Sequence, residues 1–290
     1  MGNNRGTAVL SRWLALVLAI AVIGMGSRVS AEGAPPEFPR GENITVKVLS
    51  YNIHYGMGVD GVWDLKRIGD VLAASGAEVI GLQEIDKHWS ARSQFLDETK
   101  WLADYLGMHY AFGANLDRDP LEEGGERRQY GTAILSKYPI IASDNQLITS
   151  SPREQRGLLK ATINVKGNFI HIFNTHLGLS PEERAEQTAE IVEIVGEQNG
   201  SIIMGDLNAA PNTKEILILS NAFRDAFAGS AADYTFPSNA PRIRADYIFH
   251  SDDLELGKAE VIATPASDHL PVTAEFVLKR SAPFENGVGR

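Results

Sequence analysis

The stretch Ser201-Ile202-Ile203-Met204-Gly205-Asp206-Leu207-Asn208 contains a short apolar run, which predicts a buried strand. The run stops at Gly205, where the missing side chain permits a tight turn or a close approach of another backbone. A carboxylate follows directly and a carboxamide two positions later, and such oxygen ligands suit Mg²⁺, Mn²⁺ or Ca²⁺. A strand followed by an Asx turn is the alternative explanation of this stretch taken alone.

Five further segments place polar residues at or beside a predicted apolar strand. Buried carboxylates are rare unless they are paired or bind a metal, so six such strand ends are hard to explain as separate turns. We therefore expect them to share one site. The five segments are Tyr51-Asn52, Gln83-Glu84, Asn174-Thr175-His176, Ala245-Asp246-Tyr247 and Ser267-Asp268-His269-Leu270-Pro271.

The order of the predicted elements indicates two packed β-sheets with helices on their outer faces, in one domain. Strands outnumber helices and many follow one another through short turns, which differs from the strict alternation of a doubly wound parallel sheet. The polar segment 117–129 is predicted to be a long loop, either a flap on the substrate side or a mobile segment. The predicted strands are 44–51, 79–82, 109–112, 130–136, 140–148, 158–165, 169–175, 201–204, 244–249, 255–264 and 272–278.

Four helices are expected between these strands. Asp64 is a predicted N-cap, and the helix after it is closed by Gly76. A second helix over 94–106 is predicted to carry Phe95 inward, and a short one covers 214–219. Pro181 opens another helix, whose predicted buried face consists of Ala185, Ala189, Ile191, Val192 and Val195.

The first residues have the layout of a secretory signal peptide. Arg5 and Arg12 precede an apolar run from Trp13 to Gly26, and small residues follow that permit cleavage after Ala31. An uncleaved membrane anchor is the alternative, although the run is short for a membrane span. The sequence thus predicts a signal peptide over 1–31, a linker over 32–43, one domain over 44–280 and a tail over 281–290, with a secreted or periplasmic location.

The charge balance argues against a general attraction for polyanions. The chain has 27 Lys and Arg against 37 Asp and Glu, and the predicted leader removes Arg5, Arg12 and Arg28 but no acid. Such an acidic domain weakens the case for a long nucleic acid substrate without excluding it. The absence of cysteine means that stability comes from an apolar core, and it leaves no cysteine nucleophile.

The ordered motifs resemble the endonuclease/exonuclease/phosphatase superfamily. This superfamily includes pancreatic-type deoxyribonucleases, abasic-site endonucleases, neutral sphingomyelinases and inositol polyphosphate 5-phosphatases. The resemblance covers Val46 to Leu278 and rests on Gln83-Glu84, Gly205-Asp206-Leu207-Asn208 and Ser267-Asp268-His269 in that order, with 130–136 similar to a family strand. It implies an α+β fold, a four-layer sandwich of two packed, mostly antiparallel sheets flanked by helices.

Metal ligation is expected first at Glu84, a hard carboxylate held at a strand end. Gln83 would orient Glu84 or a water molecule, with simple packing as the alternative. Asn52 would help to hold the metal or donate to a phosphate oxygen. The resemblance implies that Asp268 serves the metal or the neighbouring imidazole.

The remaining roles follow from the resemblance. Asp206 would orient or deprotonate the attacking water, and Asn208 would donate to the phosphoryl oxygens as charge develops there. His176 and His269 would lie at the scissile phosphate as acid, base or charge stabiliser, with Asp246 orienting one of them. Arg156 would contact the phosphate, unless it is a solvated arginine, and Tyr130 and His54 are further candidates.

Together these candidate residues predict a metal-dependent phosphoesterase that works by in-line attack of an activated water. One or two divalent ions are expected, Mg²⁺ first, with Mn²⁺ or Ca²⁺ as alternatives. The protein is expected to be a monomer. The basic residues are scattered and the long loop is polar, so a small soluble phosphoester is slightly favoured over nucleic acid or phospholipid. A nuclease or a sphingomyelinase-like hydrolase is the alternative, and a non-catalytic binding module on the same fold is the alternative from another class.

Overall fold

A computed structural model describes residues 43–150, 152–230 and 233–279, which belong to one compact unit of the chain. The predicted signal peptide, the tail and all but one residue of the predicted linker lie outside the described residues. Within the described ranges, no helix has both the length and the apolar character needed to cross a bilayer.

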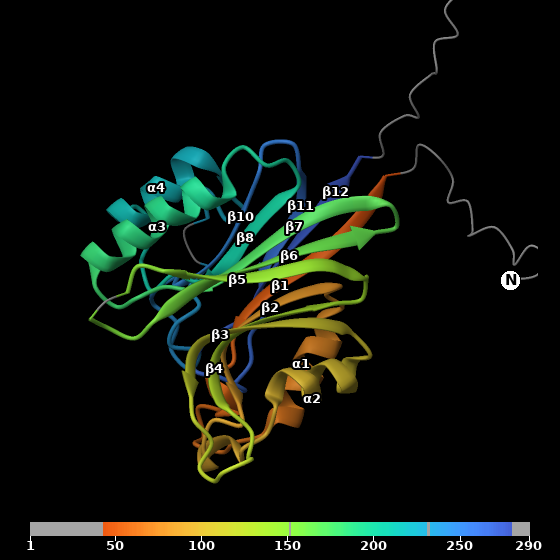
Figure 1. Ribbon diagram of the computed structural model, residues 1–290. Helices are drawn as coiled ribbons and strands as arrows, with labels where there is room; N and C mark the ends of the chain where they lie inside the picture. Colours follow the sequence, from red (N-terminus) through yellow and green to blue (C-terminus); the bar gives the residue numbers. More distant parts are fainter. Residues whose placement is uncertain (1–42, 151, 231–232, 280–290) are drawn as a thin grey trace, which may run out of the picture. The chain divides into compact units, whose positions relative to one another are not determined.

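Two packed sheets form the centre of the fold, as the sequence predicts, and each has six strands (Figure 1). The first sheet has the order β11 (Glu255–Val261), β12 (Val272–Leu278), β1 (Ile44–Asn52), β2 (Val79–Lys87), β4 (Arg128–Ser136) and β3 (His109–Arg118). The second has the order β5 (Ile140–Ile148), β6 (Arg156–Val165), β7 (Asn168–His176), β8 (Ser201–Asp206), β10 (Asp246–His250) and β9 (Arg224–Asp225).

Three apolar layers hold the sheets and helices together, which makes the unit a four-layer α+β sandwich. The layer between the sheets includes Val48 and Phe276 from the first sheet and Ile172 and Ile202 from the second. The outer face of the first sheet is covered by α1 (Leu65–Ser75) and α2 (Glu98–Leu106). That of the second is covered by α3 (Pro181–Val195) and α4 (Lys214–Ala222), seen beside β8 and β10 in Figure 1.

Each sheet contains one parallel strand pair among antiparallel neighbours. In the first sheet β1 and β2 are parallel, and in the second β7 and β8 are parallel. Parallel strands need a long crossover, and α1 and α3 supply it. Their starts agree with the sequence, since Asp64 accepts a hydrogen bond from Arg67 N at 3.0 Å and Ser180 accepts one from Glu183 N at 3.3 Å. The carboxyl ends of both parallel pairs carry the polar residues of the predicted site.

The predicted long loop over 117–129 is wrong in extent. β3 continues to Arg118 and β4 begins at Arg128, and Asp117 pairs with Gln129 across the two strands. The connection is therefore a hairpin turn over 119–127. The ends of both strands carry polar residues on both faces, so the sequence shows no alternation of apolar and polar residues there. The pairing through backbone hydrogen bonds could therefore not be predicted from the pattern.

Two predicted helical details are also wrong. The helix predicted over 94–106 begins only at Glu98, because Gln94 and Phe95 both have φ of 55°, and Phe95 is exposed. In α3 Ala189 is exposed, whereas Arg184 and Gln187 are buried. These polar side chains tolerate burial because Arg184 pairs with Glu215 at 2.7 Å and Gln187 forms hydrogen bonds with the backbone.

Several strand limits and one helix limit also differ from the prediction, among them the start of β6 at Arg156 and the end of β8 at Asp206. β10 begins at Asp246, β11 ends at Val261, β2 extends to Lys87 and α4 extends to Ala222. The short strand Arg224–Asp225 at the edge of the second sheet was not predicted, because two residues carry no periodicity.

Gly205 is required where β8 meets β7. A Cβ atom at Gly205 would lie 2.0 Å from the carbonyl oxygen of Thr175, which belongs to the rigid backbone of the neighbouring parallel strand. Gly205→Ala is expected to lower the free energy of unfolding by about 3 kcal/mol, measured by urea denaturation.

The control for this prediction is Gly61→Ala. Gly61 has φ of 72°, and no heavy atom lies within 4 Å of the position that a Cβ atom would take there. Only the backbone conformation is therefore penalised in this variant, at about 1 kcal/mol. Equal losses for the two variants would contradict the steric role of Gly205.

Candidate active site

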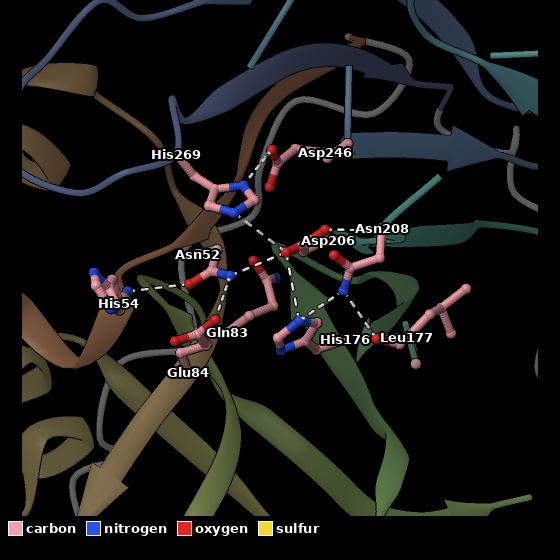
Figure 2. A network of polar contacts seen from close by, with 12 residues as sticks. Asn52, His54, Gln83, Glu84, His176, Leu177, Asp206, Asn208, Asp246 and His269 are labelled. Atoms are coloured by element: carbon pink, nitrogen blue, oxygen red, sulfur yellow. Dashed lines mark hydrogen bonds and ion pairs between the residues drawn. The ribbon is translucent and has the colours of Figure 1, made fainter. Parts of the chain in front are cut away.

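The carboxyl ends of the two parallel strand pairs meet in one cluster of polar side chains (Figure 2). Asn52 ends β1, where it pairs with Gln83 of β2, and Glu84 follows Gln83. In the second sheet His176 of β7 pairs with Asp206 of β8. Asp246 of β10 also pairs with Asp206, so neighbouring strands deliver these groups in register.

A β-bulge turns Glu84 towards the cluster. The register between β2 and β4 shifts between Leu82 and Ile85, and Glu84 has φ of 56°. Bulges redirect side chains and often lie beside functional sites, and positive φ at a non-glycine residue indicates strain that the fold must support. Glu84 accordingly leaves the alternation of the strand, which is how its carboxylate reaches Asn52.

Asn52 connects the two carboxylates. Its amide nitrogen donates to Glu84 Oε1 and to Asp206 Oδ2, each at 3.0 Å. Its amide oxygen accepts a hydrogen bond from the backbone N–H of His54 at 3.0 Å, which fixes the orientation of the amide because that N–H can only donate. Asn52 therefore presents donors, and not its oxygen, to both carboxylates.

Asp206 lies at the centre of the cluster. Its Oδ1 accepts from the backbone N–H of Asn208 at 2.9 Å, and its Oδ2 lies 3.4 Å from His176 Nε2 and 3.5 Å from His269 Nε2. Burial raises the pKa of Asp206 to about 6, against the opposing effect of the His269 charge. The carboxylate is ionised at neutral pH but takes up a proton more readily than an ordinary aspartate.

His269 is held between two carboxylates. Its Nδ1 lies 2.9 Å from Asp246 Oδ2, and the ring of Phe236 packs against it with ring centres 4.7 Å apart. Burial lowers the pKa of His269, but the charges of Asp246 and Asp206 together outweigh it and raise the pKa to about 10. The ring is therefore an imidazolium at neutral pH, with a hydrogen on each of its two nitrogens.

His176 is the neutral imidazole of the site. Burial, followed by the charge of Arg156, lowers its pKa well below the usual range. Its Nδ1 lies 3.3 Å from Arg156 Nη1 and its Nε2 lies 3.0 Å from Asn208 Nδ2. A neutral ring has one acceptor, so it can accept from only one of these two donors. Asn208 Nδ2 also donates to the carbonyl oxygen of Leu177 at 3.0 Å.

The structure places Arg156 inside the site. It is only 6% exposed and forms an ion pair with Glu154 Oε1 at 2.7 Å. It is thus not the solvated arginine that the sequence left open. Its guanidinium lies beside His176, with Nη1 3.3 Å from Nδ1 of that ring.

The other candidates lie at the edge of the cluster. Asp268 is about a third exposed, with Oδ1 3.6 Å from His54 Nδ1. Gln83 is buried and donates to Asn174 Oδ1 at 2.6 Å and to Ser50 Oγ at 3.2 Å. It therefore joins the two sheets under the site and forms no hydrogen bond with Glu84. Tyr130 is almost buried, on β4.

Comparison with known proteins is consistent with this geometry. The family model described as "Endonuclease/Exonuclease/phosphatase family" matches residues 49–269, which is most of the chain. The chain belongs to this family. Members of the endonuclease/exonuclease/phosphatase family are hydrolases of phosphoester bonds and are generally metal-dependent.

Two curated relatives and one solved structure illustrate the similarity. The protein YbhP of Escherichia coli strain K12 is 28% identical over 264 residues, 82% of this chain and 98% of its own length. Sphingomyelinase C of Bacillus cereus is 25% identical over 288 residues, covering 82% of this chain and 84% of that protein. The endonuclease/exonuclease/phosphatase structure from Beutenbergia cavernae has a TM-score of 0.68 at 23% identity, covering 83% and 72% of the two chains, and shows the common fold.

Two groups of donor atoms could hold the metal that this family generally uses. Glu84 Oε2 has no hydrogen-bond partner among the described residues, and hard carboxylate oxygens suit Mg²⁺. The second group is buried and consists of Asp206, Asp246 and His269, whose ligand atoms lie within 4.8 Å of one another. Asp246 Oδ1 is buried there without a partner.

Sequence reasoning assigned no role to two residues that support the site. Asn174 belongs to a predicted strand end, and its amide nitrogen donates to the backbone oxygens of Leu82 and Ala133 in the opposite sheet, at 2.9 and 2.8 Å. A polar residue in an apolar strand was the available signal. Phe236 gave no signal, because its contact with His269 depends on the folding of a distant loop.

Proposed function

We propose that this protein is a metal-dependent phosphoesterase that hydrolyses a phosphoester by attack of an activated water. The observation that supports this most is the position of Asp206. This buried carboxylate lies within 3.5 Å of two imidazoles and is linked through Asn52 to Glu84, a carboxylate with one unpartnered oxygen. A base, cationic donors and a ligand for a hard cation are thus assembled at one point.

Glu84 is the ligand that we assign to the cation, and the partly exposed Asp268, 3.6 Å from His54, is a second candidate. The alternative group is less favourable because Nδ1 of His269 is occupied by Asp246 Oδ2 at 2.9 Å. A bound Mg²⁺ would polarise the phosphoryl oxygens and screen their charge. The donor role of the Asn52 amide fits orientation of Glu84 and Asp206 better than direct ligation.

The proton of the attacking water passes to Asp206 in this proposal. The pKa of about 6 keeps that carboxylate ionised at neutral pH and makes it a better base than an ordinary aspartate. His269, charged and fixed by Asp246, stabilises the negative charge that develops on the phosphoryl oxygens. The electron pair of the breaking bond leaves on the ester oxygen, which receives a proton from solvent or a site donor.

The phosphate would be bound on the opposite side by His176, Asn208 and Arg156. Arg156 and Asn208 contact opposite nitrogens of the His176 ring in the free protein, although the neutral ring cannot accept from both donors at once. An anion would give the donors acceptors of their own, and charge-assisted hydrogen bonds to phosphate are stronger than those to an imidazole. This arrangement favours a tightly held phosphoryl group.

A small soluble phosphoester is our preferred substrate class. The hairpin turn over 119–127 carries Glu122, Glu123 and Glu126, and Leu121 is its one large exposed apolar side chain among the described residues. At the tip of the hairpin these carboxylates would repel a nucleic acid backbone, and the tip offers little area for insertion into lipid.

The test is a substrate panel with bis(p-nitrophenyl) phosphate, p-nitrophenyl phosphate, supercoiled plasmid and sphingomyelin vesicles. We expect Mg²⁺-dependent hydrolysis of one or both nitrophenyl esters, loss of that activity with EDTA, and its return with excess Mg²⁺. Rates on plasmid and vesicles are expected to be lower. Hydrolysis unaffected by EDTA would contradict the metal-dependent mechanism, and activity confined to sphingomyelin would contradict the substrate class.

A further inference from the structure

Three arginines and three aromatic rings form a continuous strip on the hairpin side of the first sheet. The guanidinium carbon of Arg92 lies 4.0 Å from the ring centre of Tyr55 and 5.5 Å from that of Tyr130. The ring of Tyr130 is 5.8 Å from that of Trp89, over which Arg118 lies at 4.5 Å. We call this set, with the neighbouring Arg128, the arginine strip: Tyr55, Trp89, Arg92, Arg118, Arg128 and Tyr130.

The arginine strip begins beside the catalytic carboxylates. Tyr55 follows His54, whose backbone N–H donates to Asn52 at 3.0 Å. Tyr130 is the cross-strand partner of Asp86, two residues after Glu84 in β2. His54 and Tyr55 have φ of 47° and 42°, a strained pair that the surrounding fold must hold in place. A molecule bound at Glu84 would therefore extend directly onto this strip.

Arg92 is fixed in a position from which it can still donate. Its Nε and Nη2 bind Asp86 at 2.9 and 2.7 Å, and Asp86 is fully buried and also accepts from Ser93 at 2.7 Å. The side chain of Arg92 is 37% exposed, and its Nη1 has no hydrogen-bond partner among the described residues. A buried carboxylate thus orients one guanidinium and leaves donors available to a ligand.

Arg118 and Arg128 are directly opposite each other in the antiparallel pair of β3 and β4. Like charges in this position repel and destabilise the strand pair. Neither arginine pairs with a carboxylate in the described ranges, since the neighbouring Asp117 and Asp119 are bound by Arg127 at 2.7 and 2.9 Å. Arg128 Nε donates to the backbone oxygen of Asp119 at 2.9 Å. Two arginines thus occupy opposed positions with no carboxylate partner among the described residues, in a chain of net charge −10.

We propose that the arginine strip binds a second anionic group of the substrate, a phosphate or carboxylate on the same molecule as the scissile phosphoester. This inference rests on the function proposed above and narrows its substrate class to molecules with two anionic groups. Guanidinium groups bind such anions through paired hydrogen bonds, and the aromatic faces keep the arginines in place. A bound anion would also neutralise the repulsion between Arg118 and Arg128.

The test uses two diesters that differ by a single phosphate: thymidine 5′-(p-nitrophenyl phosphate) and its 3′-phosphorylated form. The thymidine is the same in both, so its own contribution cancels. With Mg²⁺ at low ionic strength, the protein is expected to prefer the 3′-phosphorylated diester by about tenfold in kcat/KM, mainly through a lower KM. Added salt should reduce this preference, because part of the strip is exposed.

Arg92→Gln and Arg118→Gln are each expected to reduce the preference by about threefold, and Arg118→Gln/Arg128→Gln to remove most of it. Arg92→Gln leaves Asp86 buried without its partner and could unfold the protein, whereas the exposed Arg118 can be replaced without that cost. Arg224→Gln is the matched control. Arg224 is an exposed arginine on β9, at the outer edge of the other sheet, where it pairs with Asp252 at 2.6 Å, and its loss should leave the preference unchanged.

Equal kcat/KM for the two diesters would overturn the inference. So would a loss of preference in Arg224→Gln as large as the loss in Arg118→Gln. If neither diester is hydrolysed, the proposed function fails, and calorimetry decides the anion site separately. Thymidine 3′,5′-bisphosphate is then expected to bind more tightly than thymidine 5′-monophosphate, with the difference reduced in Arg118→Gln. Equal affinities for the two nucleotides would overturn the anion site on its own.

Discussion

Replacing Asp206 by Asn is expected to lower kcat by about a thousandfold on the best ester of the panel, with little change in KM. Asparagine keeps the shape of the side chain and can still contact the backbone, but it cannot take up the proton of the attacking water, and general base catalysis contributes about 10² to 10⁴ in rate. The measurement is steady-state kinetics with saturating Mg²⁺.

The pH profile separates this role from a structural one. Because the pKa of Asp206 is about 6, kcat in the unaltered protein should fall as the pH drops through that value and the carboxylate becomes protonated. The residual activity of Asp206→Asn should lack this acidic limb. The control is Asp252→Asn, a change at an exposed aspartate paired with Arg224. This variant should keep both the kcat of the unaltered protein and the fall of kcat at acidic pH. A limb that persists in Asp206→Asn would contradict the base assignment.

Replacing His269 by Gln is expected to lower kcat by about a hundredfold or more. The change removes the positive charge that we assign to stabilising the phosphoryl oxygens, and loss of one such donor costs about 10² to 10³ in rate. The variant also leaves Asp246 buried without a charged partner, so circular dichroism and urea unfolding must show that it is folded.

A double-mutant cycle with Asp246→Asn tests whether the two residues act together. Since Asp246 lies 2.9 Å from His269 Nδ1 and acts through that ring, the double variant should be little worse than His269→Gln alone. Additive losses of kcat would show that Asp246 acts independently of His269.

The sequence was informative wherever chemistry followed an apolar strand. The sequence predicts that Asp206 and Glu84 share one site, because each ends a short apolar run. The observed contact of both carboxylates with Asn52 agrees with that expectation. The cap Asp64 and the start of α3 at Pro181 are equally local features. Signals of this kind depend on neighbours in the chain, so one sequence is enough to find them.

Features that depend on distant pairing could not be predicted. The burial of Arg156 follows from its contacts with Glu154 and His176, and a sequence cannot distinguish that arginine from a solvated one. The opposition of Arg118 and Arg128 depends on the register of two polar strands, where apolar alternation is missing. The direction of the Asn52 amide is likewise set by a single backbone N–H, that of His54.

The most direct test of Glu84 as the ligand of a catalytic Mg²⁺ is a titration of Mg²⁺ into the unaltered protein and into Glu84→Gln. Binding is followed by calorimetry, and activity by the rate of ester hydrolysis. We expect saturable Mg²⁺ binding in the unaltered protein, with hydrolysis rising over the same concentration range. Glu84→Gln should lose most of both, because a neutral amide replaces the assigned carboxylate ligand while Asn52 and Asp206 remain. Full Mg²⁺ binding and full Mg²⁺-dependent hydrolysis in Glu84→Gln would contradict the assignment of Glu84 as the metal ligand.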